Sequence, residues 1–282
     1  MSIRMIQERL LSYSCGSEQE EELALREITQ EVILVALSRN GFFGHAMFQG
    51  GTCLRIFHGL NRFSEDLDFV LEEPAHDFRL TPFLNGIGSE LEAYGYHLEI
   101  KDRSSSESTV KKAFIKDDSL GNVLQLSFAS RRGPRKKIRV KLEVDTNPPS
   151  GSRSELRYHD FPFVASVVVQ DRPSLFAGKL HALLCREYVK GRDWYDFLWY
   201  TAQRSEINYE LLLSALEQTG PWRGEDLQIN VKWLRNELAA VIKRINWRAT
   251  ADDVRPFVPD SEQPSLDLWN EDLFLSQLSK VR

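Results

Sequence analysis

The chain has 282 residues, 42% of them hydrophobic, and a formal net charge of −5. This length and composition predict a globular protein with a sizeable core, in one large domain or two smaller ones. The acidic balance excludes a surface that is basic throughout, so any nucleic-acid site must be a local patch.

The three cysteines, Cys15, Cys53 and Cys185, are odd in number and too widely spaced for a disulfide framework or a zinc site, so we expect reduced thiols. The N-terminal sequence MSIRMIQERLLSYSC contains no apolar signal core. The longest apolar run, residues 32–37, is far shorter than the roughly 20 residues of a membrane span. We therefore expect a cytoplasmic protein that does not bind membranes.

The first part of the chain alternates predicted helices and strands. Ser17 and Glu20 form a capping box, and apolar residues at helical spacing then predict a helix that ends near Gly41. The patterns that follow predict a strand at 46–49, a helix at 52–60, a strand at 67–71, a helix at 81–94 and an extended segment at 97–101.

The middle of the chain predicts a meander, and the end predicts helices. Strands are expected at 110–116, 123–129 and 138–145, then a loop at 147–154 and a strand at 164–169. The remainder predicts helices at 174–190, 193–203, 208–218, 225–246 and 266–279. We therefore expect an α+β fold, in which a mixed β-sheet domain with flanking helices at 1–160 precedes a mostly helical domain at 161–282.

The segment 48–71, FQGGTCLRIFHGLNRFSEDLDFVL, places two carboxylates in an apolar strand. Asp66 and Asp68 are two residues apart, so they point to one face of the strand while Leu67 and Phe69 point to the other. Two such carboxylates can bind a divalent cation, although carboxylates that merely face solvent would show the same spacing.

The glycine turn before this strand favours the functional interpretation. Gly50 and Gly51 allow close approach of a ligand to the backbone, and a helix that begins at Thr52 offers N–H groups to phosphate. A phosphate-binding turn beside a carboxylate pair predicts a nucleoside triphosphate (NTP) site with Mg²⁺.

Two sequence blocks resemble the AbiEii/AbiGii toxin family of nucleotidyltransferases, the toxins of type IV toxin–antitoxin and abortive-infection pairs. The first contains GGTCLR from Gly50 and RFSEDLDFVL from Arg62. The second contains Lys179 in FAGKLHALLCRE, followed by GRDWYDF from Gly191. Both blocks occur in the family's order within residues 46–200.

The resemblance implies a fold of the DNA polymerase β type, with the Asp66 strand at the edge of a mixed sheet. It also implies a third metal-binding carboxylate on a neighbouring strand. The strand KIRVKLEVD offers Glu143 as the first candidate and Asp145 as the second, on the face opposite its apolar residues. An exposed strand face would give the same pattern.

The second block supplies further candidates. The resemblance implies that Lys179 contacts the triphosphate, with a solvated helix lysine as the alternative. Asp193 either only caps the next helix or also orients a site lysine or arginine. Arg55 and Arg62 are candidate partners of phosphate or carboxylate, with a plain surface role as the alternative. Ser64 is a candidate nucleotide contact through phosphate, with a loop-capping role as the alternative.

A basic segment between residues 131 and 141 contains no acidic residue and is predicted to project from a hairpin. A solvated turn is the alternative to RNA binding. The candidate RNA-binding residues are Arg131, Arg132, Arg135, Lys136, Lys137 and Arg139.

The resemblance therefore implies a toxin that transfers a nucleoside monophosphate from an NTP to RNA, first of all to the tRNA 3′ end, with two Mg²⁺ ions. Such a reaction would block translation and growth. It also implies an antitoxin encoded nearby that forms no stable complex. The alternatives are a transferase that modifies protein hydroxyls and an inactive module that binds RNA.

Overall fold

The computed structural model of the chain describes residues 2–104, 108–117 and 138–282, and divides into two compact units. Unit 1 comprises Met1–Gly59, Phe63–Pro148 and Glu155–Val169. Unit 2 comprises Leu60–Arg62, Pro149–Ser154 and Gln170–Arg282. Unit 2 thus comprises the C-terminal part of the chain together with two short earlier segments, 60–62 and 149–154.

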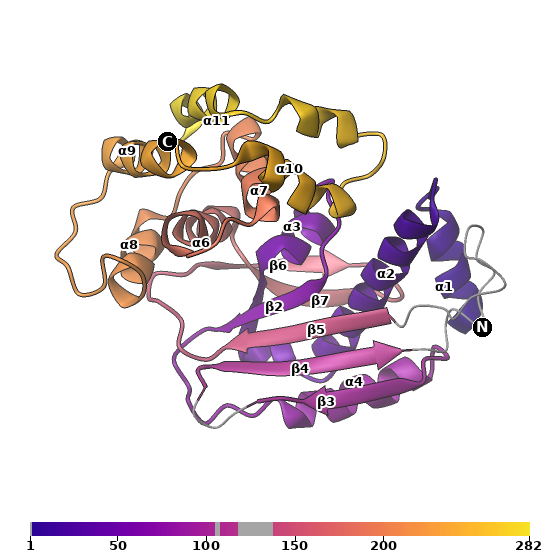
Figure 1. The fold of residues 1–282 in the computed structure, drawn as a ribbon. Helices are drawn as coiled ribbons and strands as arrows, with labels where there is room; N and C mark the ends of the chain where they lie inside the picture. Colours follow the sequence, from indigo (N-terminus) through magenta and orange to yellow (C-terminus); the bar gives the residue numbers. More distant parts are fainter. Residues whose placement is uncertain (1, 105–107, 118–137) are drawn as a thin grey trace. The chain divides into compact units, whose positions relative to one another are not determined.

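Unit 1 contains a mixed sheet, whose described strands are ordered β3-β4-β5-β2-β1-β7-β6 (Figure 1). The strands are β1 (Ala46–Gln49), β2 (Asp66–Leu71), β3 (Leu98–Asp102), β4 (Val110–Asp117), β5 (Ile138–Asp145), β6 (Ser154–His159) and β7 (Ala165–Gln170). β2 is antiparallel to β1 and parallel to β5. The Asp66 strand therefore lies inside the sheet, which corrects the edge position implied by the resemblance.

The α-helices in the described residues of unit 1 are α1 (Ser2–Leu11), α2 (Glu18–Arg39), α3 (Gly50–His58) and α4 (Thr81–Glu92). The predicted cap of α2 is confirmed, because the Ser17 side chain accepts a hydrogen bond from the Glu20 N–H at 3.3 Å. Every residue from 27 to 37 of α2 is buried. α2 is thus a central helix of the unit.

Strand alternation separates the core from the carboxylates, as predicted. Leu67 and Phe69 are at most 1% exposed, and the Phe69 ring centroid lies 4.9 Å from that of Phe42 and 5.2 Å from that of Phe48. Phe48 also meets Phe57 of α3 edge-to-face. The helices therefore cover the Phe69 face, and Asp66 and Asp68 point to the opposite face.

Unit 2 is helical and has an aromatic core. Its helices are α6 (Arg172–Cys185), α7 (Gly191–Ala202), α8 (Tyr209–Gln218), α9 (Val231–Ile242), α10 (Trp247–Val254) and α11 (Glu271–Gln277). Trp247 stacks on Phe274 at 3.8 Å between centroids, and Trp194 packs edge-on against the same two rings. These ring contacts join α7, α10 and α11.

Among the described α-helices and strands, α1, β6 and α10 were not predicted. The expected strand 123–129 lies outside the described residues. Within the described ranges, no helix is long and apolar enough to cross a membrane.

Candidate active site

The turn between β1 and α3 brings the backbone against one of the two aspartates. Gly50 has φ +78°, and a Cβ at this position would lie 2.5 Å from Asp68 Oδ2. The register pairs Gln49 with Asp68, so the turn begins where the carboxylate stands. Only glycine combines this backbone conformation with so close an approach.

The residues after this turn hold the start of β2 in place. Thr52 is fully buried, and its hydroxyl donates a hydrogen bond to the Asp66 carbonyl oxygen. Ser64 is 9% exposed, and its carbonyl oxygen accepts a hydrogen bond from Gln30 of α2. The Thr52 hydroxyl thus fixes the start of the strand. The groups that the sequence proposes as phosphate donors are therefore the first-turn backbone N–H groups of α3, including that of half-buried Gly51.

Arg55 is bound within unit 1. Its Nε donates to Glu27 of α2 at 2.8 Å, and its guanidinium lies over the Phe63 ring at 4.5 Å. Glu27 also accepts a hydrogen bond from Tyr13 at 2.9 Å. These contacts tie α3 to α2 through a buried carboxylate, and they place Arg55 in a supporting position.

The predicted third carboxylate lies next to the aspartate pair. The parallel register of β2 and β5 places Glu143 opposite Asp68, Lys141 opposite Asp66, and Asp145 opposite Val70. Residues opposite each other in a ladder project from the same face of the sheet. Glu143, the first candidate, is thus level with the pair, whereas Asp145 lies one step beyond it and accepts a hydrogen bond from the Asn147 N–H at 2.9 Å.

Two lysines occupy the Glu143 oxygens. Lys141 Nζ lies 2.7 Å from Oε2, and Lys112 Nζ of β4 lies 3.0 Å from Oε1. Burial alone would raise the pKa of Glu143, but the hydrogen bonds and charges of the two lysines outweigh it and lower the pKa. Glu143 is therefore ionised and held between two cations.

The contacts of Lys141 and Glu143 decide which of these carboxylates could hold a divalent metal. Burial would lower the pKa of Lys141, but the hydrogen bond and charge of Glu143 and the charges of Asp66 and Asp68 raise it. The Lys141 ammonium thus already experiences the field of this carboxylate set, whose hard oxygen ligands suit Mg²⁺. In the described residues, however, no group of three or more His, Cys, Asp or Glu side chains is placed to hold a metal ion. The donor set therefore fits through Asp66 and Asp68, while Glu143 would first have to leave a lysine.

A second cluster of charges lies in unit 2, between α6 and α7. Lys179 Nζ lies 2.6 Å from Asp193 Oδ1 and 2.8 Å from Asp196 Oδ2. Arg62 binds Asp196 with two hydrogen bonds, of 2.6 and 2.7 Å, and Arg186 lies 3.0 Å from Asp193. Three cations thus surround two carboxylates, and the cluster carries one excess positive charge.

The cluster is buried, and its charges sustain one another. Asp196 is fully buried, and the side chains of Arg62, Asp193 and Lys179 are between 3% and 12% exposed. Burial would raise the pKa of Asp193, but the charges of Lys179 and Arg186 lower it to about 2. Burial would also lower the pKa of Lys179, yet the charges of the two aspartates raise it. Asp193 and Lys179 are therefore both ionised at neutral pH.

The start of α7 explains how its two aspartates reach Lys179. The helix begins at Gly191, where a Cβ would lie 2.2 Å from the Thr250 carbonyl oxygen of α10. Asp193 and Asp196 are three residues apart, so they share one face of α7. Asp193 lies in the first turn but does not cap the helix, since the N-cap is Lys190. The orienting role expected for Asp193 is thus the one that its contacts support.

The cluster includes Asp196 and Arg186, which the sequence did not assign to the site, and Arg62, which the sequence offered as a partner of phosphate or carboxylate. Asp196 lies in the segment GRDWYDF, and its i, i+3 spacing from Asp193 indicated that the two side chains share one face of a helix. Arg186 carried no signal, and Arg62 is 134 residues from its partner Asp196.

Most of the predicted RNA-binding residues, from Arg131 to Lys137, lie outside the described residues. Arg139 is exposed on β5 and is paired in register with Lys116 of β4. With Lys141 and Lys112 they occupy the sheet face of Asp66. This basic strip, defined as Lys112, Lys116, Arg139 and Lys141, leads along the strands toward the carboxylates.

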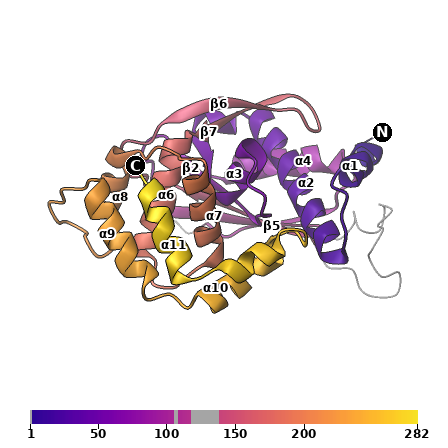
Figure 2. The same ribbon diagram turned by 90° about the horizontal axis from the view of Figure 1, so that it is seen from above.

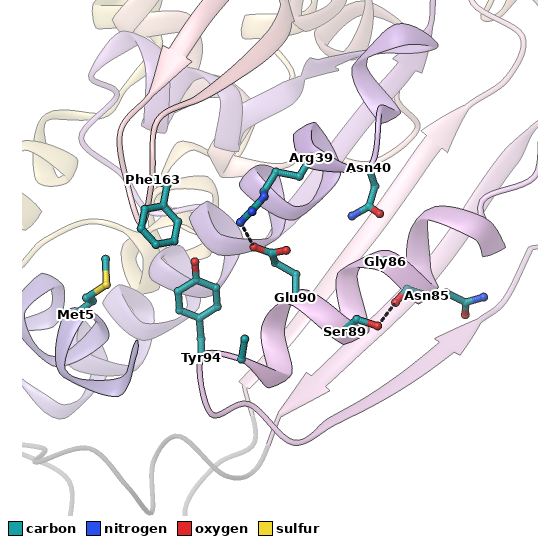
Figure 3. A pocket seen from close by; sticks show the side chains of 10 residues that line it. Met5, Arg39, Asn40, Asn85, Gly86, Ser89, Glu90, Tyr94 and Phe163 are labelled. Atoms are coloured by element: carbon teal, nitrogen blue, oxygen red, sulfur yellow. Dashed lines mark hydrogen bonds and ion pairs between the residues drawn. The ribbon is translucent and has the colours of Figure 1, made fainter. Parts of the chain in front are cut away.

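An open cavity of about 710 Å³ lies elsewhere in unit 1 (Figure 3). It is lined by α2 and α4 residues, among them Arg39 and Glu90, whose ion pair of 2.5 Å crosses it, and by Tyr94 and Phe163. None of the site residues predicted from the sequence lines this cavity. It is therefore not the candidate active site.

Solved structures share the fold at low sequence identity. The nucleotidyltransferase toxin MenT4 from Mycobacterium tuberculosis H37Rv matches with a TM-score of 0.52 and 17% identity, over 100% of this chain and 99% of that chain. JHP933 from Helicobacter pylori matches with a TM-score of 0.51 and 18% identity, over 93% of this chain and 89% of that chain. A comparison with curated protein sequences gives no match.

The family comparison covers most of the chain. The family described as nucleotidyl transferase AbiEii toxin, type IV toxin–antitoxin system, matches residues 32–272. This range includes the Gly50 turn, the Asp66 strand and the Lys179 cluster. The chain therefore belongs to the AbiEii family of nucleotidyltransferase toxins of type IV toxin–antitoxin systems.

Proposed function

We propose that this nucleotidyltransferase transfers a nucleoside monophosphate from an NTP to a hydroxyl at the 3′ end of tRNA. The acceptor oxygen bonds to the α-phosphorus of the NTP, the hydroxyl loses its proton, and pyrophosphate leaves. The observation that carries the proposal is the placement of Asp68, against the Gly50 backbone and level with Glu143. This arrangement combines a phosphate-binding turn with carboxylates on one sheet face.

Membership of the family implies an NTP substrate, a divalent metal and an antitoxin partner. We assign the metal to Asp66 and Asp68, with Glu143 ahead of Asp145 as the third carboxylate. When bound, Mg²⁺, as two ions in our proposal, would neutralise the triphosphate and activate the acceptor hydroxyl. The antitoxin is expected to be encoded nearby and to act without a stable complex.

The residues of the chain itself bind and orient the triphosphate in this proposal. The backbone N–H groups of Gly50, Gly51 and Thr52 donate to phosphate oxygens. Lys179 contributes its ammonium, which Asp193 and Asp196 hold in position. Such preorganised charge requires little rearrangement during the reaction.

We propose that the two units contribute to the same reaction. Asp66→Ala and Lys179→Ala should then each lower the transfer rate, and the double variant should lose much less than the product of the two effects, because groups that act as a unit are not additive. Single-turnover rates with labelled NTP would measure this. Fully multiplicative losses would contradict a shared role. Arg55 and Ser64 remain second-rank nucleotide contacts, since Arg55 is bound to Glu27.

RNA is the preferred acceptor because of the basic strip. Lys112 has a side-chain exposure of 43%, and Arg139 is exposed on the same sheet face. Counterion release makes such binding salt-dependent. Lys116→Glu combined with Arg139→Glu should therefore weaken RNA binding and flatten its salt dependence. Unchanged affinity in a filter-binding titration would remove the basic strip from the RNA path.

The defining experiment incubates the purified protein with each labelled NTP, Mg²⁺ and total RNA or total protein. Label in tRNA that is absent with Asp66→Ala supports the proposal. Label in protein would instead identify a transferase that modifies protein hydroxyls, and no label in either pool would indicate an inactive RNA-binding module. Activity against tRNA would also explain a block of translation and growth in the cytoplasm.

A further inference from the structure

The strand β6 combines an open sheet edge with exposed apolar side chains. Among the described strands it has one neighbour, β7, and it lies beside β7 at the margin of the sheet (Figure 2). Leu156 and Tyr158 of β6 are 55% and 72% exposed, and Phe163 and Val164 in the following turn are 52% and 76% exposed. Open edges with exposed apolar residues invite pairing with another strand.

The other face of β6 carries two opposite charges. Glu155 and Arg157 are bonded to each other at 2.7 Å, with side-chain exposures of 35% and 43%. His159 meets Phe57 of α3 edge-to-face at 6.0 Å, so this face is the one that the helices cover. Leu156 and Tyr158 therefore point to the opposite face of the sheet.

The order of these charges is self-complementary under two-fold symmetry. In an antiparallel pair, two residues that lie opposite each other both direct their backbone N–H and C=O groups toward the partner strand, or both away from it. When the two strands are identical and related by a two-fold axis, one residue therefore lies opposite its own copy, and the pairing is centred on that residue. Centring on Glu155 or on Arg157 places like charges opposite each other, which is destabilising. Centring on Leu156 places each Glu155 opposite the Arg157 of the second copy, and Leu156 opposite Leu156.

We propose that β6 is a dimerisation surface that pairs antiparallel with β6 of a second copy of this chain, centred on Leu156. The sheets of the two copies become continuous through this pair. Four alternating charges then lie on one face, and Leu156 and Tyr158 of the two copies adjoin on the other. Such pairing also removes two open edges that would otherwise be prone to aggregation.

The opposite edge of the sheet does not offer the same combination. β3 has a similar order of charges, with Glu99 bonded to Lys101 at 2.6 Å. However, none of the exposed large apolar side chains in the described residues lies on β3. An edge lysine without exposed apolar neighbours is typical of edges that resist pairing. The self-pairing edge is therefore β6.

The test uses charge reversal and its rescue. Glu155→Arg and Arg157→Glu should each weaken dimerisation about tenfold or more, because both cross-strand ion pairs become repulsive. The double variant Glu155→Arg/Arg157→Glu should dimerise like the wild type. An equimolar mixture of the two single variants should form a heterodimer, since one chain then carries two arginines and the other two glutamates.

Sedimentation equilibrium across a concentration series would measure the dissociation constants, and far-UV circular dichroism would confirm that every variant is folded. A wild-type chain that is monomeric throughout the series overturns the proposal, as do single variants that dimerise as tightly as the wild type. Failure of the mixture to associate also overturns it. Recovery in both the double variant and the mixture supports the Leu156-centred pairing, in which residue 155 of one copy faces residue 157 of the other.

Discussion

The fully buried Asp196 is predicted to be the main electrostatic support of unit 2. It accepts two hydrogen bonds from Arg62, at 2.6 and 2.7 Å, and lies 2.8 Å from Lys179. Asp196→Asn keeps the volume of the side chain but removes its charge. Breaking a buried charge pair by removing one partner costs about 3–5 kcal/mol, so we expect a melting temperature lower by roughly 10 °C.

Asp193→Asn is the matched control. Asp193 also binds two cations, Lys179 at 2.6 Å and Arg186 at 3.0 Å, but the Arg186 side chain is 29% exposed, whereas that of Arg62 is 3% exposed. The expected loss is about 1–3 kcal/mol, as for a charged hydrogen bond. The comparison therefore distinguishes the loss of a carboxylate that pairs with the buried Arg62 from the loss of one that pairs with the more exposed Arg186.

Tryptophan fluorescence is well suited to this comparison, because all six tryptophans of the chain lie in unit 2. Urea unfolding followed by fluorescence thus reports on the unit that contains the cluster, and far-UV circular dichroism reports on the whole chain. An Asp196→Asn variant that is no less stable than Asp193→Asn would refute the role assigned to the Arg62 pair.

The other predictions concern the turn, the pH dependence and Lys179. Gly50→Ala should lose transfer activity as well as about 1–2 kcal/mol of stability, because its Cβ would displace Asp68. The control Gly59→Ala has a similar φ of +75° but open space around it, so it should lose only stability. Equal activities of these two variants would contradict the close approach. The pKa of Asp193 falls from 3.8 to about 2 on folding, so its charge contributes about 2 kcal/mol to the free energy of unfolding above pH 4, and this contribution is lost as the pH falls through 2. The difference in urea-unfolding free energy between wild type and Asp193→Asn should therefore shrink over that range. A constant difference would exclude this linkage. Lys179→Ala should reduce the transfer rate by about a hundredfold or more, and a wild-type rate would cancel its proposed phosphate contact.

Local patterns in the sequence predicted the central elements well. β5 was predicted at 138–145 and is observed there, and the alternation of β2 separated Leu67 and Phe69 from the two aspartates. These features depend on side-chain periodicity and on turn chemistry, which neighbouring residues determine. The position of β2 inside the sheet could not be predicted, since the order of strands depends on pairings between distant segments.

Two of the missed elements are short helices, α1 with 10 residues and α10 with 8. Ile6 and Leu10 are the buried apolar residues of α1, and β6 exposes Leu156 and Tyr158 instead of burying them. The pairing of Arg62 with Asp196 was missed for another reason. Arg62 meets Asp196 across 134 residues of sequence, and no local pattern encodes an ion pair at that separation.

The register of β2 and β5 narrows the choice of a third carboxylate. The sequence left Glu143 and Asp145 as alternatives, and Glu143 is the one level with Asp68. Its two lysine contacts were not foreseen, because Lys112 comes from β4 and reaches Glu143 only through the antiparallel pairing of β4 with β5. Lys112 therefore holds Oε1 of Glu143, the atom that the proposed metal contact would need.

The most direct measurement is transfer of label from NTP to tRNA by the wild type and by Asp66→Ala, with Mg²⁺ and with the stability of both proteins checked. Asp66 is only half buried and lies on the face away from the core, so its removal should leave the fold intact. The proposed function predicts labelled tRNA 3′ ends with the wild type and none with Asp66→Ala. Equal labelling by the two proteins would contradict it.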